Sequence, residues 1–257
     1  MPLLFSCADT KKQLNYAQHA KGNYDLGEEA FKAKDYTEAV EYFNQVRNKF
    51  PYSKYAVIAE VRAADALFED EKYVEATEQY KMFLKMRPTN EKAPHAMFRI
   101  GMCSYYQMPK DWFFMPPVYE EDLTYVKSTI DAMQALVLRF PNAPEVKKAR
   151  EVTDQCRMRL AKHEMYVAKF YFKDEKWQAS YNRAKGLVDT YSNLGMDDEA
   201  MVIMAKCLVK LGRKEEARPL LERMELEFPN SKSISDARKL LKQIGPAPKP
   251  APAPPSS

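Results

Sequence analysis

A repeat of 37 residues is the feature that most constrains how this chain can fold. Ala39 and Ala76 end two similar five-residue segments and are 37 residues apart. A proline marker keeps the same spacing, since Pro51 and Pro88 are also 37 residues apart. Periods of this length are typical of stacked arrays, in which each repeat buries its apolar face against the next one. The chain is therefore predicted to form an array of similar units rather than one closed core.

The same pattern continues in the second half of the chain. Ser180 and Ala217 are again 37 residues apart, and Pro229 closes a further unit. Pro88 and Pro141 are 53 residues apart, which is one period plus an insertion of 16 residues. The third unit is therefore expected to contain an insertion, which we place at 109–124.

The units share an order of a small residue, aromatic residues, an alanine and a closing proline, although Thr129 and Ser180 replace the alanine in two units and Tyr191–Ser192 replaces the proline in one. This order resembles the tetratricopeptide repeat, a helix–turn–helix of about 34 residues. The small residues allow two helix backbones to approach each other, and the proline ends the second helix because it cannot donate a backbone hydrogen bond. The resemblance implies an all-α, right-handed solenoid of five tetratricopeptide repeats. We place the five units at 20–53, 57–90, 94–143, 144–194 and 198–231.

Flanking segments complete the predicted domain organisation. Residues 1–19 read as a residual lipoprotein signal and tether, 20–245 as the repeat domain, and 246–257 as an unstructured tail rich in proline and alanine. Proline and glycine are absent from 145–173, and apolar residues recur there with helical spacing, so one long helix should join the third and fourth units. A capping helix is expected to end at Ile244 and to start at Ser231 or Ser233.

Composition excludes several classes of protein. Glycine accounts for 7 of 257 residues, too few for the tight turns of a many-stranded barrel or sandwich. The net charge of +4, from 40 basic and 36 acidic residues, argues against a general nucleic-acid binder. The three histidines are scattered and no catalytic or phosphate-binding motif accompanies them. We therefore expect a protein that is not an enzyme and that needs no cofactor or metal.

The four cysteines fall into two groups. Cys103, Cys156 and Cys207 lie in apolar helical patterns and are expected to be buried free thiols. Cys7 ends the segment Leu4–Cys7, which resembles a bacterial lipobox and predicts acylation of this cysteine. The preceding residues are too few for a whole signal peptide. The alternative is an ordinary exposed cysteine.

Several segments resemble one family of repeat proteins. The resemblance covers about 20–231 and combines five repeats, an insertion in the third and a lipidated N-terminus. The family is BamD, also called YfiO or ComL, the lipoprotein of the outer-membrane β-barrel assembly machine (BAM). The segments that carry the resemblance are 122–124, 130–136, 139–142, 159–171 and 177–183.

This resemblance implies a non-enzymatic scaffold, lipid-anchored on the periplasmic face of the outer membrane. Such a protein binds the POTRA region of BamA, unfolded outer-membrane protein precursors and, in some lineages, accessory BAM lipoproteins. No nucleic-acid partner is expected. The alternative is a different periplasmic tetratricopeptide adaptor that serves envelope division or chaperone docking.

Two surfaces of different character are expected on the first helices of the units. Residues 1–142 carry a net charge of −2 and residues 143–244 a net charge of +5. The aromatic end is predicted to bind the substrate peptide through Lys21, Tyr24, Phe31, Phe68, Phe98, Tyr105 and Tyr106. The basic end is predicted to bind BamA through Lys169, Lys173, Lys206, Lys210 and Arg183, the last of these on the strength of the family resemblance. Ordinary helix packing and a solvated lysine face are the alternatives.

Overall fold

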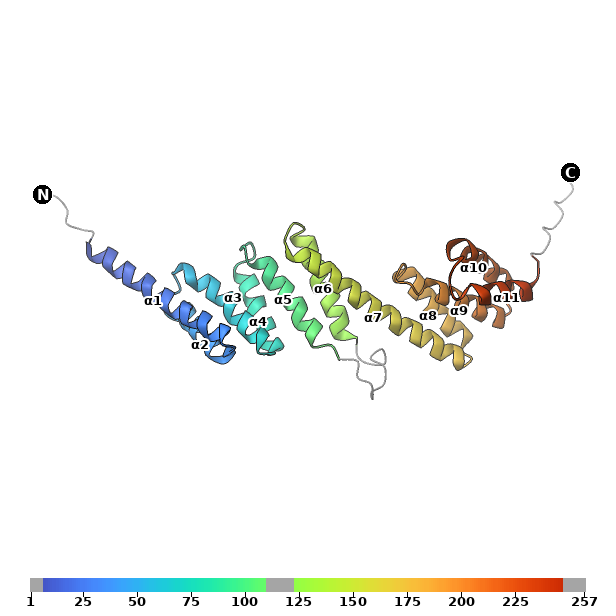
Figure 1. The fold of residues 1–257 in the computed structure, drawn as a ribbon, viewed down its shortest axis with the longest axis horizontal. Helices are drawn as coiled ribbons and strands as arrows, with labels where there is room; N and C mark the ends of the chain where they lie inside the picture. Colours follow the sequence, from blue (N-terminus) through green and yellow to red (C-terminus); the bar gives the residue numbers. More distant parts are fainter. Residues whose placement is uncertain (1–6, 110–122, 247–257) are drawn as a thin grey trace. The chain divides into compact units, whose positions relative to one another are not determined.

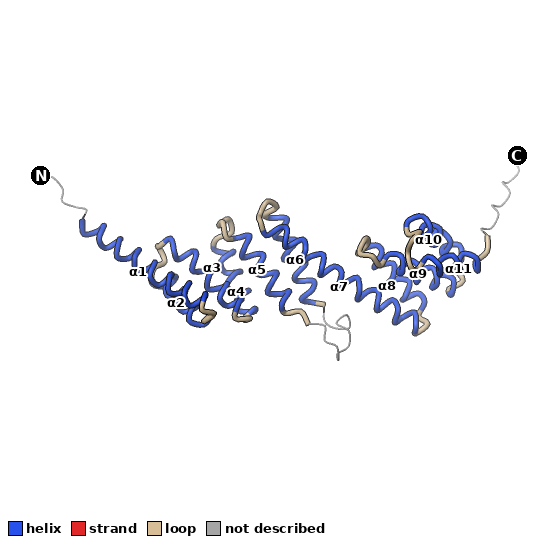
Figure 2. Tube along the Cα trace, in the orientation of Figure 1, coloured by secondary structure: helices blue, strands red, loops and turns tan. Residues whose placement is uncertain are grey.

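The computed structural model describes residues 7–109 and 123–246, and all regular secondary structure within these ranges is helical (Figures 1 and 2). The helices there are α1 Cys7–Lys32, α2 Tyr36–Lys49, α3 Lys54–Glu69, α4 Tyr73–Met86, α5 Ala93–Tyr106, α6 Thr124–Arg139, α7 Glu145–Lys173, α8 Trp177–Thr190, α9 Asp197–Lys210, α10 Lys214–Glu227 and α11 Ile234–Ile244.

The helices belong to two compact units. The first contains the described residues up to 109 together with 123–156, and the second contains 157–246. Within the first unit each helix from α1 to α6 packs on the next (Figure 1), and within the second unit α8 to α11 do the same. This order of helical hairpins confirms the predicted all-α tetratricopeptide fold, including the single long helix α7 and the capping helix α11.

Local sequence signals explain where these helices begin and end. The Asp35 side chain caps α2 by accepting a hydrogen bond from the backbone N–H of Glu38 at 3.0 Å, and Ser53 caps α3 in the same way. At the other end, Phe50 leaves the helical conformation with φ −131° and ψ 50° because Pro51 follows it. The repeated proline therefore ends α2 where the sequence predicted.

Small residues let the paired helices approach closely. A Cβ atom added at Gly27 of α1 would lie 2.7 Å from the ring of Phe43 in α2, so only glycine fits there without a shift of the ring. Ser180 takes the second small position of its unit, and its hydroxyl donates to the carbonyl of Ala168 at 2.8 Å. The polar side chain is thus fully buried without an unpaired donor.

Three cysteines behave as predicted from their apolar surroundings. Cys103, Cys156 and Cys207 are buried, and none of them is in a disulfide. Burial raises the pKa of the Cys103 and Cys207 thiols, which keeps them protonated and unreactive at neutral pH.

The first helix starts earlier than the repeat pattern suggested. Helix α1 begins at Cys7, so the segment expected to be a tether is helical from its first described residue. Residues 8–21 contain neither proline nor glycine, which allows the helix to extend. The Cys7 side chain, the core of the insertion at 110–122 and the tail at 247–257 lie outside the described residues.

Candidate functional site

Three neighbouring helices of the first unit, α1, α3 and α5, form a continuous packed row. Each is the first helix of its repeat, so each presents the positions where the sequence predicted peptide binding. We call this surface the α1–α3–α5 face and define it by Glu28, Phe31, Asp65, Phe68 and Arg99 together with the residues that contact them. Charged and aromatic side chains alternate along it.

Asp65 lies at the centre of this face. It is only 5% exposed, yet four donors from three helices surround its carboxylate. The Tyr80 hydroxyl donates to it at 2.5 Å, His95 Nε2 lies 2.8 Å away, and the guanidinium groups of Arg62 and Arg99 lie at 3.2 and 3.9 Å. Such complete pairing is what allows a carboxylate to be buried.

These donors also determine the charge of the cluster. Burial by itself would raise the pKa of Asp65, but hydrogen bonds from His95 and Tyr80 and the charge of Arg99 hold it below the ordinary value. Burial and the neighbouring Asp65 carboxylate raise the pKa of Tyr80. Asp65 is therefore an anion and Tyr80 a neutral donor at neutral pH.

The two arginines connect Asp65 to partners on either side. Arg62 donates from Nε and Nη2 to the two oxygens of Glu28 at 2.6 and 3.0 Å, which is a bidentate pair between α3 and α1. Arg99 lies 3.2 Å from Glu69 and so joins α5 to α3. The resulting ladder of alternating charges crosses all three helices and keeps them in register.

Each arginine also covers an aromatic ring. The Arg62 guanidinium carbon lies 4.0 Å from the centre of the Phe31 ring, and that of Arg99 lies 4.3 Å from the centre of the Phe68 ring. Tyr73 and Tyr106 contact Phe68 edge-on, and Phe68 is only 6% exposed. The Phe68 ring, predicted to contact the peptide, therefore packs between helices and is largely covered by its neighbours.

The other aromatic residues of the predicted site differ in accessibility. Tyr106 is the most accessible of them, 46% exposed and stacked parallel on Tyr73 at 5.7 Å. Tyr105 is half-buried and donates from its hydroxyl to Gln155 at 2.9 Å, and Phe98 is also half-buried. Burial and the neighbouring Glu28 raise the pKa of the half-buried Tyr24 to about 12.

Lys21 is exposed on α1 and pairs with Asp25 one helical turn later, at 2.5 Å. An exposed pair of this kind contributes little to stability and exchanges readily. The Lys21 ammonium therefore stays available to another carboxylate.

The predicted basic end lies in the second unit, and most of its cations have partners. Lys169 pairs with Glu199 at 2.7 Å, and Lys206 pairs with Asp236 at 2.8 Å. Lys210 lies 5.5 Å from the centre of the Trp177 ring, and Lys173 is exposed. Two of the four lysines of the predicted basic end therefore lie in exposed ion pairs of the same kind as that of Lys21, which contribute little to stability and exchange readily.

Arg183 on α8 is the remaining member of the basic set. Its side chain is 45% exposed, and one guanidinium nitrogen lies 3.2 Å from both oxygens of Glu164 on α7. The pair holds the guanidinium against α7 but leaves part of it open to solvent. Arg183 therefore lies at the surface of the second unit, where a partner protein can reach it.

The repeats of this chain match those of a known protein family. A family model described as YfiO, an outer membrane lipoprotein, matches residues 16–224 and so covers helices of both units. The chain belongs to the YfiO family.

Relatives with an assigned role are consistent with this membership. The chain is 24% identical over 222 residues to the outer membrane protein assembly factor BamD of Caulobacter vibrioides, covering 86% of this chain and 70% of the relative. It is 26% identical over 209 residues to BamD of Rickettsia prowazekii, covering 81% and 80%. Among solved structures, the TPR2AB-domain:pHSP90-complex of yeast Sti1 aligns with a TM-score of 0.45 and 17% identity, covering 88% of this chain and 85% of that one.

The residues of the charged ladder recur in the sequence with the period of the repeat, a pattern that the spacing of alanine and proline alone does not reveal. Glu28 and Asp65 are 37 residues apart, and so are Arg62 and Arg99. Acid and arginine therefore recur at the period of the repeat in this YfiO family member. A search for charged residues with this 37-residue spacing would therefore have found the ladder from the sequence.

Metal clusters and membrane spans are both absent from the described residues. No group of three or more histidine, cysteine, aspartate or glutamate side chains in 7–109 and 123–246 could hold a metal ion. In the same part of the chain, no helix is both long and apolar enough to span a membrane.

Proposed function

We propose that this YfiO family member is a non-enzymatic, lipid-anchored scaffold of the BAM complex that binds BamA and unfolded outer-membrane protein precursors. The family match over 16–224 carries this proposal, because it extends through the repeats of both units. The relatives named as assembly factors support the same role. The match also favours this role over the alternative of a different periplasmic tetratricopeptide adaptor.

The α1–α3–α5 face is the proposed site for precursor peptides. An unfolded barrel strand presents alternating aromatic side chains and can end in a free carboxylate. Tyr106 offers a ring for stacking, and Lys21 offers a cation for the carboxylate. The charged ladder fixes the helices beneath them, so that only the peptide loses conformational freedom on binding.

Tyr106→Ala is expected to weaken binding of a peptide with an aromatic C-terminus by about 1–3 kcal/mol, because exposed aromatic anchors usually contribute this much. Isothermal titration calorimetry with the intact chain measures the change. Tyr52→Ala is the matched control, since Tyr52 is 95% exposed and lies outside this face. Equal affinities for the wild type and the Tyr106 variant would remove this face from peptide binding.

Arg183 is the proposed contact with the POTRA region of BamA. Arg183→Glu should weaken that interaction by about 1–3 kcal/mol, because it removes the charged donor and places a second carboxylate beside Glu164. Affinities for a POTRA fragment and for the barrel peptide are measured in parallel. Lys185→Glu is the control on the same helix, and peptide affinity should stay unchanged in both variants. The assignment of Arg183 to the POTRA contact would be contradicted if neither variant lost POTRA affinity, or if both lost it to the same extent.

Cys7 is the proposed site of the lipid anchor. Cys7→Ser should abolish incorporation of labelled palmitate and release the protein from the outer-membrane fraction of cells, because each buried methylene of an acyl chain contributes about 0.8 kcal/mol to membrane binding. Ser6→Ala keeps a small residue before the cysteine and should still be acylated. Palmitate incorporation into the Cys7→Ser protein would refute the anchor.

A further inference from the structure

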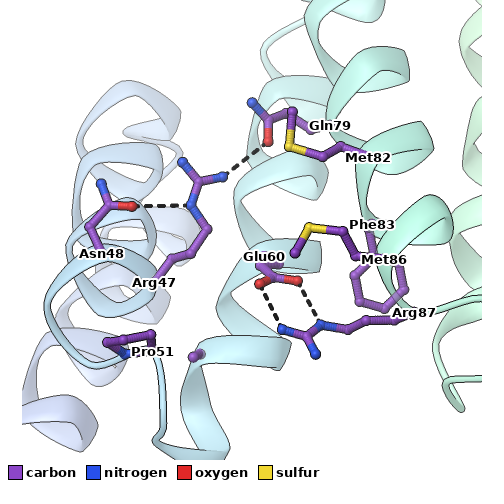
Figure 3. A pocket seen from close by; sticks show the side chains of 10 residues that line it. Arg47, Asn48, Pro51, Glu60, Gln79, Met82, Phe83, Met86 and Arg87 are labelled. Carbon is purple, nitrogen blue, oxygen red and sulfur yellow. Dashed lines mark hydrogen bonds and ion pairs between the residues drawn. The ribbon is translucent and has the colours of Figure 1, made fainter.

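A second site in the first unit shares no residue with the α1–α3–α5 face. A cavity of about 410 Å³ lies between α2, α3 and α4. Figure 3 shows Arg47 and Asn48 on the α2 side of this cavity and Gln79, Met82 and Met86 on the α4 side. We call it the α2–α4 groove. None of the roles proposed above uses it.

One positive charge in the groove lacks an anionic partner. Arg87 donates to both oxygens of Glu60, at 3.0 and 3.1 Å, and this bidentate pair is neutral overall (Figure 3). Arg47 instead donates to the amide oxygens of Gln79 and Asn48, at 3.2 and 3.4 Å. No carboxylate in the described part of the chain pairs with Arg47. The charged groups that line the groove therefore sum to +1, and this charge complements one carboxylate.

The mouth of the groove is apolar. Met82 and Met86 lie one helical turn apart on α4 and are 53% and 65% exposed, while Phe83 is buried behind them. Methionine side chains are flexible and polarizable, which suits them to surfaces that accept another protein. Exposed apolar side chains beside a cavity and an open cation are typical of a binding site.

We infer that the α2–α4 groove binds an amphipathic helix of a partner protein that places an acidic side chain against Arg47 and a large apolar side chain between Met82 and Met86. The one-turn spacing of the two methionines matches the spacing of side chains along one face of a helix. A slot between two helices is also the shape into which a third helix packs. This site is independent of the peptide and BamA sites proposed above.

The test uses the intact chain with ¹³C-labelled methionine methyl groups and a synthetic helical peptide of about 18 residues, long enough to be helical in water. The peptide carries two leucines one turn apart and a single glutamate on the adjoining face, and its twin has glutamine in place of the glutamate. We expect the methyl signals of Met82 and Met86 to shift on titration. The glutamate peptide should bind about tenfold more tightly than its twin, since a charged hydrogen bond is then made.

Arg47→Gln should abolish the preference for glutamate. Lys49→Gln removes the same charge from the same helix outside the groove and should retain the preference. Met86→Gln, at an exposed position, should weaken the binding of both peptides to the same extent. It serves as the test if circular dichroism shows that Arg47→Gln does not fold. The proposal would be overturned if the methyl signals did not shift or if the two peptides bound equally well. It would also be overturned if Arg47→Gln and Lys49→Gln had equal effects, or if a peptide whose only carboxylate is its C-terminus bound more tightly.

Discussion

Phe68→Ala is expected to lower the free energy of unfolding of the first unit by about 3–5 kcal/mol, the usual cost of emptying a buried phenylalanine site. The ring is almost fully covered by Arg99, Tyr73 and Tyr106, so its removal leaves a cavity and uncovers a guanidinium. Hydrogen exchange of α3 to α5 during urea titration measures this unit separately from the second one.

The control variants separate stability from binding at this position. Tyr52→Ala removes an exposed ring from the same unit and should change its stability by less than about 0.5 kcal/mol. Phe68→Leu keeps most of the volume and should preserve the fold. A stable Phe68→Ala protein that has lost peptide affinity would mean that the ring is a binding anchor after all.

Asp65→Ala is expected to destabilise the first unit by about 3 kcal/mol, because it removes the anion at the centre of a buried charge network. Tyr80 and His95 lose their partner, whereas Arg62 and Arg99 keep only Glu28 and Glu69. The same exchange experiment measures the loss. Asp131→Ala, at an exposed position on α6, is the matched control and should have little effect.

The pH dependence of the same network provides a second test. The pKa of Asp65 in the folded protein lies below its ordinary value of 3.8, so its contribution to stability is present above that value. The contribution is lost as the pH falls through the lower folded pKa. The stability difference between the wild type and Asp65→Asn should therefore be constant near neutral pH and should narrow in acid. A difference that stays the same down to pH values of about 2 would show that the Asp65 charge is not stabilising.

Local signals in the sequence were sufficient for the helical framework. The proline spacing placed the ends of the second helices, and the absence of proline and glycine from 145–173 predicted α7. The low glycine content did not indicate the turns within the repeats. Residues other than glycine adopt positive φ angles there, namely Lys34, Glu71 and Glu175 with 64°, 58° and 57°. Among the turns of this kind that the structure describes, glycine takes the corresponding place only at Gly212, so the turns are not evident from composition.

The candidate sites were predicted less completely. Helical periodicity correctly assigned Phe68 and Tyr106 to neighbouring first helices of the repeats, but it did not distinguish the covered ring from the exposed one. The partners of Lys169 and Lys206 are 30 residues away in the chain. Whether such a cation is open or neutralised depends on how successive hairpins pack, and periodicity within one helix contains no information on that packing.

The repeat, most of the helix boundaries, the buried thiols and the family therefore follow from the sequence alone, whereas the early start of α1 at Cys7 does not. These follow from short-range physical effects: the spacing of small residues, the missing donor of proline and side-chain capping. Which charged side chains contact each other depends instead on the tertiary packing. Asp65 accepts hydrogen bonds from donors on α3, α4 and α5, whereas Arg47 has no carboxylate partner among the described residues. Each outcome depends on side chains that hairpin packing brings together from distant parts of the chain.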